Sequence, residues 1–186
     1  MRFRVELSHE AQKQLSRFPR DVRERMERAI NQADQSLGET RRTIMSMRLP
    51  ALESHTLPEA LSAIGAQLTK GKPITFHLTV RGLVRQLRYD VQANFYLIGR
   101  EAITNAVNHA KARRILAQMM YSEREVRLTV EDDGSGFDPE AAMEKEDHWG
   151  VAGMRERATQ IGASFSLESA LGRGTKIGVS VECKKQ

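Results

Sequence analysis

The stretch EDDGSGFD, residues 131–138, limits the fold of this chain more than any other feature. It follows VRLTV, residues 126–130, where apolar and polar residues alternate as in a β-strand with one buried face. Two carboxylates and two glycines therefore stand where a predicted strand ends. A plain turn is the simplest explanation, because Asp-Gly is a common turn dipeptide. Whether the stretch is more than a turn depends on the sequence around it.

Two other loop types do not fit this stretch. In a calcium-binding loop with Gly134 at the sixth position, Thr129 would stand at the first position, where an Asp is needed. A Walker loop or a dinucleotide fingerprint requires a glycine-rich turn that opens a helix directly. A nucleotide pocket remains as the alternative to a turn. Its glycines would let the backbone approach a flat ring, and a buried Asp would accept a hydrogen bond from an exocyclic amine.

The segment GREAITNAVNHA, residues 99–110, predicts a helix with two distinct faces. At about 100° per residue, Glu101, Asn105 and Asn108 lie within about 60° of one another, and Phe95 and Ile98 lie on a face suited to a sheet. Solvent exposure would explain the polar face. However, a solvated face usually carries Lys and Glu, and amides are middling helix formers. Because side-chain oxygens suit a hard cation, a metal site is the alternative.

Two further glycine clusters favour the nucleotide pocket. Gly150-Val-Ala-Gly153-Met154 lies 14 residues beyond Gly136 and opens a predicted helix, whose free amides would attract phosphate. Gly172-Arg-Gly174-Thr175 enters the last predicted strand. Each cluster alone is a weak signal. Their order after an amide-bearing helix and Asp-x-Gly-x-Gly is specific.

The remaining patterns predict an α+β fold, a two-layer sandwich with one mixed sheet and helices over one face. Strands are expected at 73–80, 113–121, 125–132, 164–169 and 175–182, and helices at 58–70, 90–109 and 150–161. Two helices in a hairpin precede this part, separated at Pro19 and ended at Pro50. The second carries apolar residues at alternating steps of four and three, as in a helix-bundle seam, from Met26 to Met47.

Composition excludes several classes of protein. The net charge of +5 is spread along the chain without interleaved aromatic residues, so no direct nucleic-acid binding is expected. Cys183 is the only cysteine, and no internal disulfide is possible. No apolar run approaches the roughly 20 residues that cross a bilayer, and the start MRFRVELSHE is too polar for a signal peptide. We expect a cytoplasmic location, with membrane anchoring of the full-length protein left open.

The order of these motifs resembles the GHKL (Bergerat) ATP-binding fold of sensor histidine kinases, the heat-shock chaperone ATPase, mismatch-repair ATPases and type II topoisomerases. The resemblance covers about residues 73–182. REAITNAVNHAKA and GVAGMRERATQIGA look like the NarL/DesK-type sensor histidine kinases, and ADQSLGETRRTIMSMR, residues 33–48, resembles the second helix of their dimerisation and phosphotransfer domain. The resemblance divides the chain into truncated dimerisation and phosphotransfer helices at 1–50, a linker and short helix at 51–72, and a catalytic ATP-binding domain at 73–186.

The resemblance implies a role for each matching residue. Asp132 would bind the adenine amine in a pocket shaped by Gly134 and Gly136, with support from Thr175. Asn105 would coordinate Mg²⁺ that bridges the phosphates of ATP, and Glu101 would hold a water or orient the metal's ligands. Asn108 and His109 would lie near the phosphates. The family usually has Lys or Arg at the position of Asn108. Gly150 and Gly153 would hinge a short lid, residues 137–149, and present amides. The predicted nucleotide site also includes Val151 and Met154.

The resemblance also implies the reaction and the partners. The kinases of this family transfer the γ-phosphoryl of ATP to their own His, and then to an Asp on the receiver domain of a response regulator. His9 has an acidic residue next to it and Gln14 five positions later, but it lies only ten residues before Pro19. The register places the acceptor upstream of Met1, so we expect a fragment that lacks its acceptor. The resemblance implies a homodimer through the N-terminal helices and leaves open whether the fragment itself dimerises.

Two other functions are compatible with parts of the sequence. One is a nucleotide-binding or dimerising module without phosphotransfer activity. The other is a serine kinase of the anti-sigma type, which has the same fold. The N-terminal pair of helices and the segment GMRERA, residues 153–158, argue against the second.

Overall fold

The computed structural model describes Val22 and residues 49–139 and 149–183. The chain divides into two compact units, Met1–Arg48 and Leu49–Gln186, and the second contains the fold described here. The expected helical hairpin, including His9, and residues 140–148 of the expected lid lie outside the described residues.

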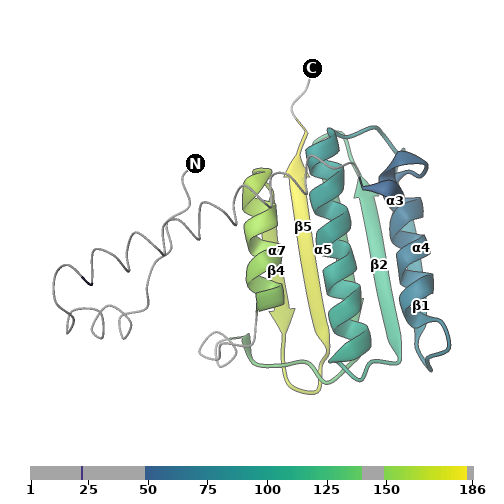
Figure 1. Ribbon diagram of the computed structural model, residues 1–186, viewed down its shortest axis with the longest axis vertical. Helices are drawn as coiled ribbons and strands as arrows, with labels where there is room; N and C mark the ends of the chain where they lie inside the picture. Colours follow the sequence, from purple (N-terminus) through teal and green to yellow (C-terminus); the bar gives the residue numbers. More distant parts are fainter. Residues whose placement is uncertain (1–21, 23–48, 140–148, 184–186) are drawn as a thin grey trace. The chain divides into compact units, whose positions relative to one another are not determined.

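A five-stranded mixed sheet forms one layer of this unit (Figure 1). Its strands are β1 (Thr75–Arg81), β2 (Arg114–Tyr121), β3 (Glu125–Asp132), β4 (Ser164–Ser169) and β5 (Thr175–Glu182), in the order β1-β2-β3-β5-β4. β1 runs parallel to β2, and the other neighbouring pairs are antiparallel. The alternating segments of the sequence therefore form strands within two residues of the predicted bounds.

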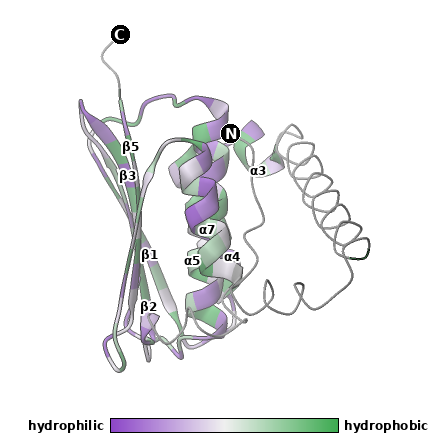
Figure 2. Cartoon of the chain, turned by 90° about the vertical axis from the view of Figure 1, so that its left-hand side faces the viewer, coloured by the Kyte–Doolittle hydropathy of each residue, from purple (hydrophilic) through white to green (hydrophobic). Residues whose placement is uncertain are grey.

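Helices cover one face of the sheet and form the second layer (Figure 2). They are α3 (Pro50–Glu53), α4 (Leu57–Thr69), α5 (Tyr89–Asn108) and α7 (Trp149–Gln160). The two-layer α+β fold with a mixed sheet is confirmed. The short helix α3 was not predicted, and it begins with the proline that was expected to end a helix.

The core lies between these two layers. Its largest fully buried side chains are Phe95, Leu61, Ile98, Ile103, Ile115, Met119, Leu128, Met154, Val126, Val179 and Asn94. The other face of the sheet carries mainly polar, exposed side chains, such as Thr75, His77, Arg127 and Lys176. The alternation of apolar and polar residues along each strand produces these two faces.

Helix α4 is part of this core. Leu61 is fully buried, and a Cβ added at Gly99 of α5 would lie 2.6 Å from Leu61 Cδ2. The close approach of α4 and α5 therefore needs a residue without a side chain at position 99. At the start of α4, Glu59 Oε2 accepts a hydrogen bond from the Thr56 N–H at 2.7 Å, which is one half of a capping box.

Replacing Leu61 with Ala should lower the free energy of unfolding by about 2–5 kcal/mol, because it leaves a cavity between α4 and the sheet. Leu83→Ala is the matched control, since that leucine is 91% exposed and should change stability by less than about 0.5 kcal/mol. Urea denaturation measures both values. Equal effects for the two variants would show that α4 is not part of the core.

Candidate functional site

A row of three polar side chains lies at the end of the sheet on its helix-covered face. In the register, Thr175 of β5 is opposite Asp132 of β3 on one side and Ser169 of β4 on the other. Residues directly opposite each other point to the same face of a sheet. The next row inward on that face is apolar and consists of Val130, Ile177 and Leu167. The three polar side chains therefore border an apolar floor.

Asp132 is buried, with 8% of its surface exposed. Burial raises the pKa of its carboxyl group, while backbone N–H groups of Gly134 and Thr175 act in the opposite direction. The bond from the Gly134 N–H to Asp132 Oδ1 is 2.9 Å long. A buried carboxylate with these partners remains an acceptor for a donor group of a ligand.

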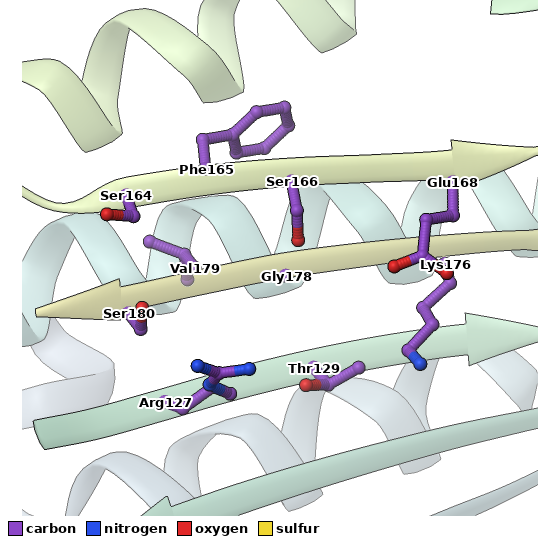
Figure 3. Close-up of a pocket in the computed structure, with 10 residues that line it drawn as sticks. All are labelled: Arg127, Thr129, Ser164, Phe165, Ser166, Glu168, Lys176, Gly178, Val179 and Ser180. Carbon is purple, nitrogen blue, oxygen red and sulfur yellow. The ribbon is translucent and has the colours of Figure 1, made fainter.

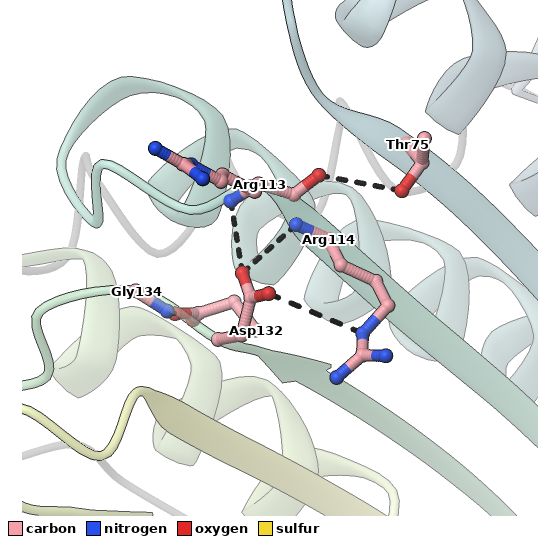
Figure 4. A network of polar contacts seen from close by, with 6 residues as sticks. Thr75, Arg113, Arg114, Asp132 and Gly134 are labelled. Atoms are coloured by element: carbon pink, nitrogen blue, oxygen red, sulfur yellow. Dashed lines mark hydrogen bonds and ion pairs between the residues drawn. The ribbon is translucent and has the colours of Figure 1, made fainter.

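The neighbouring Asp133 points elsewhere and has a different environment. Its Oδ1 accepts hydrogen bonds from the backbone N–H groups of Arg113 and Arg114, both at 2.8 Å. Figure 4 draws these bonds as dashed lines from the labelled Arg113 and Arg114. Its Oδ2 lies 4.0 Å from Arg114 Nε. These groups, led by the Arg114 N–H, lower the pKa of Asp133. Asp133 therefore ties the end of β3 to the start of β2.

The glycines after β3 are required by close backbone contacts on both sides of the loop. A Cβ at Gly134 would overlap the carbonyl oxygen of Ala110, just beyond the end of α5. Gly136 has a φ of 56°, and a Cβ there would overlap the carbonyl oxygen of Ala170 in the β4–β5 turn. Two backbone hydrogen bonds fix the same approach, from Ser135 N to Ala110 O at 2.7 Å and from Gly172 N to Ser135 O. The loop is therefore held between α5 and the β4–β5 turn.

Gly150, near the start of α7, lies against the polar face of α5. A Cβ at this position would be 2.7 Å from Glu101 Oε1 and 3.3 Å from Asn105 Nδ2. Glu101 and Asn105 are one turn apart on α5 and are both half-buried. The structure therefore brings together three of the predicted residues from two helices, and a side chain at position 150 would displace the Glu101 carboxylate.

Asn108 and His109 lie at the exposed C-terminal end of α5. Asn108 Oδ1 accepts a hydrogen bond from Lys72 Nζ at 3.4 Å. The His109 N–H donates to the Asn105 carbonyl oxygen at 2.8 Å and closes the last turn of the helix. The ammonium group of Lys72, in the connection between α4 and β1, thus lies beside Asn108, which was predicted to lie near the phosphates.

Comparison with known proteins connects this geometry with a family. Residues 90–185 match the family described as "Histidine kinase-, DNA gyrase B-, and HSP90-like ATPase". The matched region includes α5, the loop after β3, α7 and the β4–β5 turn, and so contains every predicted site residue. The chain belongs to this ATPase family.

Sensor histidine kinases are among the similar proteins. ComP of Bacillus subtilis (strain 168) is 29% identical over 162 residues, which are 87% of this chain and 21% of ComP. YdfH of the same strain is 39% identical over 88 residues, 47% of this chain and 21% of YdfH. The chain thus spans about a fifth of the length of each, and the predicted resemblance to sensor histidine kinases is confirmed. The NarL/DesK type stays a prediction.

Solved histidine kinase structures share the fold. The histidine kinase domain from the Erythrobacter litoralis EL346 blue-light activated histidine kinase is 25% identical, with a TM-score of 0.52. The alignment covers 67% of this chain and 58% of that chain. The GHKL fold of this ATPase domain is therefore confirmed.

Among residues 49–139 and 149–183, no helix has the length and apolar character needed to cross a bilayer.

The remaining predicted residues of the ATPase domain differ in their surroundings. Met154 is 1% exposed and belongs to the core, and Val151 is half-buried against it. A Cβ at Gly153 would meet nothing within 4 Å. Met154 is thus a core residue that is closed to a ligand, and Gly153 is not required by packing among the described residues.

The donor set on α5 of the ATPase domain fits a magnesium ion that arrives with its nucleotide. Mg²⁺ usually keeps several waters and uses one or two protein ligands together with substrate phosphates. Glu101 supplies a carboxylate and Asn105 an amide oxygen, side by side at the start of α7. In the part of the chain that the structure describes, no group of three or more His, Cys, Asp or Glu residues is placed to hold a metal ion by itself.

A hollow of about 220 Å³ lies on the other face of the ATPase domain's sheet (Figure 3). Gly178 and Ser166 are among the residues that line it. Arg127, Glu168 and Lys176 contribute charged groups to its walls. None of the predicted site residues lines this hollow.

Ser169 of the ATPase domain was not among the site residues predicted from the sequence. Its Oγ accepts a hydrogen bond from the Phe137 N–H at 2.9 Å and lies 3.0 Å from the Gly174 carbonyl oxygen and 3.1 Å from Thr175 Oγ1. A signal for this residue was present. In SFSLES, the inward positions are Phe165, Leu167 and Ser169, so a hydroxyl stands where the alternation calls for an apolar side chain.

The opposite pKa shifts of Asp132 and Asp133 predict opposite effects of pH on stability. Because the pKa of Asp132 is raised, the wild type should gain stability relative to Asp132→Asn as the pH falls from 7 through that raised pKa, and level off below the ordinary value. Because the pKa of Asp133 is lowered, the wild type should lose stability relative to Asp133→Asn as the pH falls from the ordinary value through the lowered one.

Urea denaturation of the three proteins between pH 7 and about pH 3 measures both differences. Each variant is the control for the other, because both change an Asp to an Asn at adjacent positions. Differences of the same sign would contradict the two environments.

Proposed function

We propose that residues 73–186 form the catalytic domain of a two-component sensor histidine kinase, which binds Mg-ATP between α5, α7 and the loop after β3. Membership of the ATPase family supports ATP as the ligand. The observation that carries the assignment of residues is the convergence of Asp132, Gly134, Glu101, Asn105 and Gly150 around α5.

In this proposal, Asp132 accepts a hydrogen bond from the exocyclic amine of adenine. The carboxylate is buried at the edge of an apolar floor suited to a flat ring. A charge-assisted hydrogen bond contributes about 1.5–3 kcal/mol. Gly134 and Gly136 let the loop lie close to α5 and the β4–β5 turn, and so fix the position of the backbone beside Asp132.

The phosphates lie toward the start of α7 in this proposal. Free backbone N–H groups at a helix N-terminus favour anions, and α7 begins at Trp149–Gly150, next to Glu101 and Asn105. Asn105 would hold Mg²⁺, and Glu101 would orient a water beside it. A metal ion there would supply positive charge that offsets the negative charge of the phosphates. Asn108 and His109 face the same end, and Lys72 adds a positive charge there.

Phosphoryl transfer follows from this binding site and an acceptor outside the domain. The ATP domain positions the γ-phosphoryl group and neutralises charge, and it needs no covalent chemistry of its own. The acceptor is a His of the dimerisation and phosphotransfer helices, to which residues 1–50 belong and through which the protein forms a homodimer. The phosphoryl group then passes to an Asp of a response regulator receiver domain.

Asp132→Asn should weaken ATP binding about tenfold to a hundredfold, because the amide offers a neutral acceptor in place of a carboxylate. Isothermal titration calorimetry with Mg-ATP measures the dissociation constant. Glu131→Gln is the matched control, since that neighbour is exposed on the other face of β3 and should bind as the wild type does. An unchanged affinity in Asp132→Asn would overturn the assignment of the base.

Asn105→Ala should remove most of the gain in ATP affinity that Mg²⁺ provides, a loss of about tenfold at saturating Mg²⁺. Titrations with Mg²⁺ and with EDTA separate this loss from a general weakening of binding. Thr104→Ala is the control, because the Thr104 hydroxyl bonds to Arg100 O within its own helix. The role of Asn105 fails if its variant responds to Mg²⁺ as the wild type does.

A further inference from the structure

Ser169 connects three parts of the proposed base pocket through one hydroxyl group. It lies at the end of β4, and its Oγ accepts a hydrogen bond from the Phe137 N–H at 2.9 Å, in the loop after β3. The same oxygen lies 3.0 Å from the carbonyl oxygen of Gly174 and 3.1 Å from Thr175 Oγ1. The loop after β3 and the start of β5 therefore meet at this side chain at the end of β4.

The donors and acceptors at Ser169 allow one consistent arrangement of hydrogens. A hydroxyl has one hydrogen to donate and two lone pairs. The Gly174 carbonyl oxygen can only accept, so the hydrogen of Ser169 is committed to it. The Thr175 hydroxyl must then donate to Ser169, since two hydroxyl oxygens at 3.1 Å share a hydrogen from one of them. Thr175 keeps lone pairs for a ligand and has no hydrogen left to donate.

We propose that Ser169 is a specificity-determining residue, which makes the polar edge of the base pocket accept hydrogen bonds only. Thr175 stands directly beside Asp132 in the strand register, and the carboxylate also accepts only. Both groups then favour a purine that carries an amine at position 6, and both oppose one that carries a carbonyl oxygen there. The inference rests on the proposed ATP site and explains why that site would prefer adenine to a purine with a carbonyl oxygen at position 6.

Ser169 acts through Thr175 and is not itself placed against the base. Without the Ser169 hydroxyl, the Thr175 hydroxyl can rotate and donate to a carbonyl oxygen at position 6. A site whose buried groups are left without partners rejects the mismatched ligand strongly, so freeing this hydrogen relaxes the rejection.

Inosine triphosphate is the probe, because it carries a carbonyl oxygen at position 6 and lacks the 2-amine of guanine. Titration calorimetry gives the dissociation constants of its magnesium complex and of Mg-ATP. In Ser169→Ala, the ratio of the inosine constant to the ATP constant should fall by about fivefold or more. Ser166→Ala, on the outward face of the same strand, should keep the wild-type ratio.

Ser169→Cys keeps the size of the side chain but is a weak donor and acceptor. Ser169→Cys should also lower the ratio of the inosine constant to the ATP constant. It replaces Ser169→Ala in the experiment if the alanine variant does not fold. In a Thr175→Val background, no hydroxyl can rotate, and Ser169→Ala or Ser169→Cys should leave the ratio unchanged.

A purely structural role for Ser169 would weaken both nucleotides by the same factor, and an unchanged ratio would overturn the proposal. This failure is distinct from failure of the proposed function. If the wild type binds ATP and Asp132→Asn weakens it, but the ratio does not move in either Ser169 variant, only the role of Ser169 is wrong. If the wild type does not bind ATP, the proposed function and this inference are both overturned.

Discussion

The burial of one carboxylate at the end of β3 is the constraint on which the rest of the site depends. Asp132 is 8% exposed, and burial raises its pKa, so the folded chain carries an unfavourable charge at neutral pH. Such a group is ordinarily stabilised by partners, and two backbone N–H groups serve it here. A ligand amine would complete the set of partners, which gives this carboxylate a function that a turn alone does not explain.

The elements around Asp132 are held close together by residues that lack side chains. Gly174 has a φ of 73°, and a Cβ there would overlap the Asp132 carbonyl oxygen. Gly134 and Gly136 are similarly confined by backbone atoms of Ala110, just beyond α5, and of the β4–β5 turn. The loop, the turn and the two helices therefore form a packed frame around the apolar floor, and the ATPase family match extends over all of it.

Much of this fold is readable from the sequence because it depends on local periodicity. The alternation in EVRLTVED and the two faces of GREAITNAVNHA follow from strand and helix geometry alone. The hydrogen-bond partners of Ser169 and of Asp133 could not be predicted, because the bonds join distant segments: Phe137 and Ser169 are 32 residues apart, and Asp133 and Arg113 are 20 apart. The bond between Lys72 and Asn108, 36 residues apart, was missed for the same reason.

The most direct measurement is a crystal structure of the chain with Mg²⁺ and a non-hydrolysable ATP analogue. We expect the amine of adenine within hydrogen-bonding distance of the Asp132 carboxylate, and the metal and phosphates beside Asn105 and the start of α7. A base seated anywhere else, including the hollow around Gly178 on the opposite face of the sheet, would contradict it.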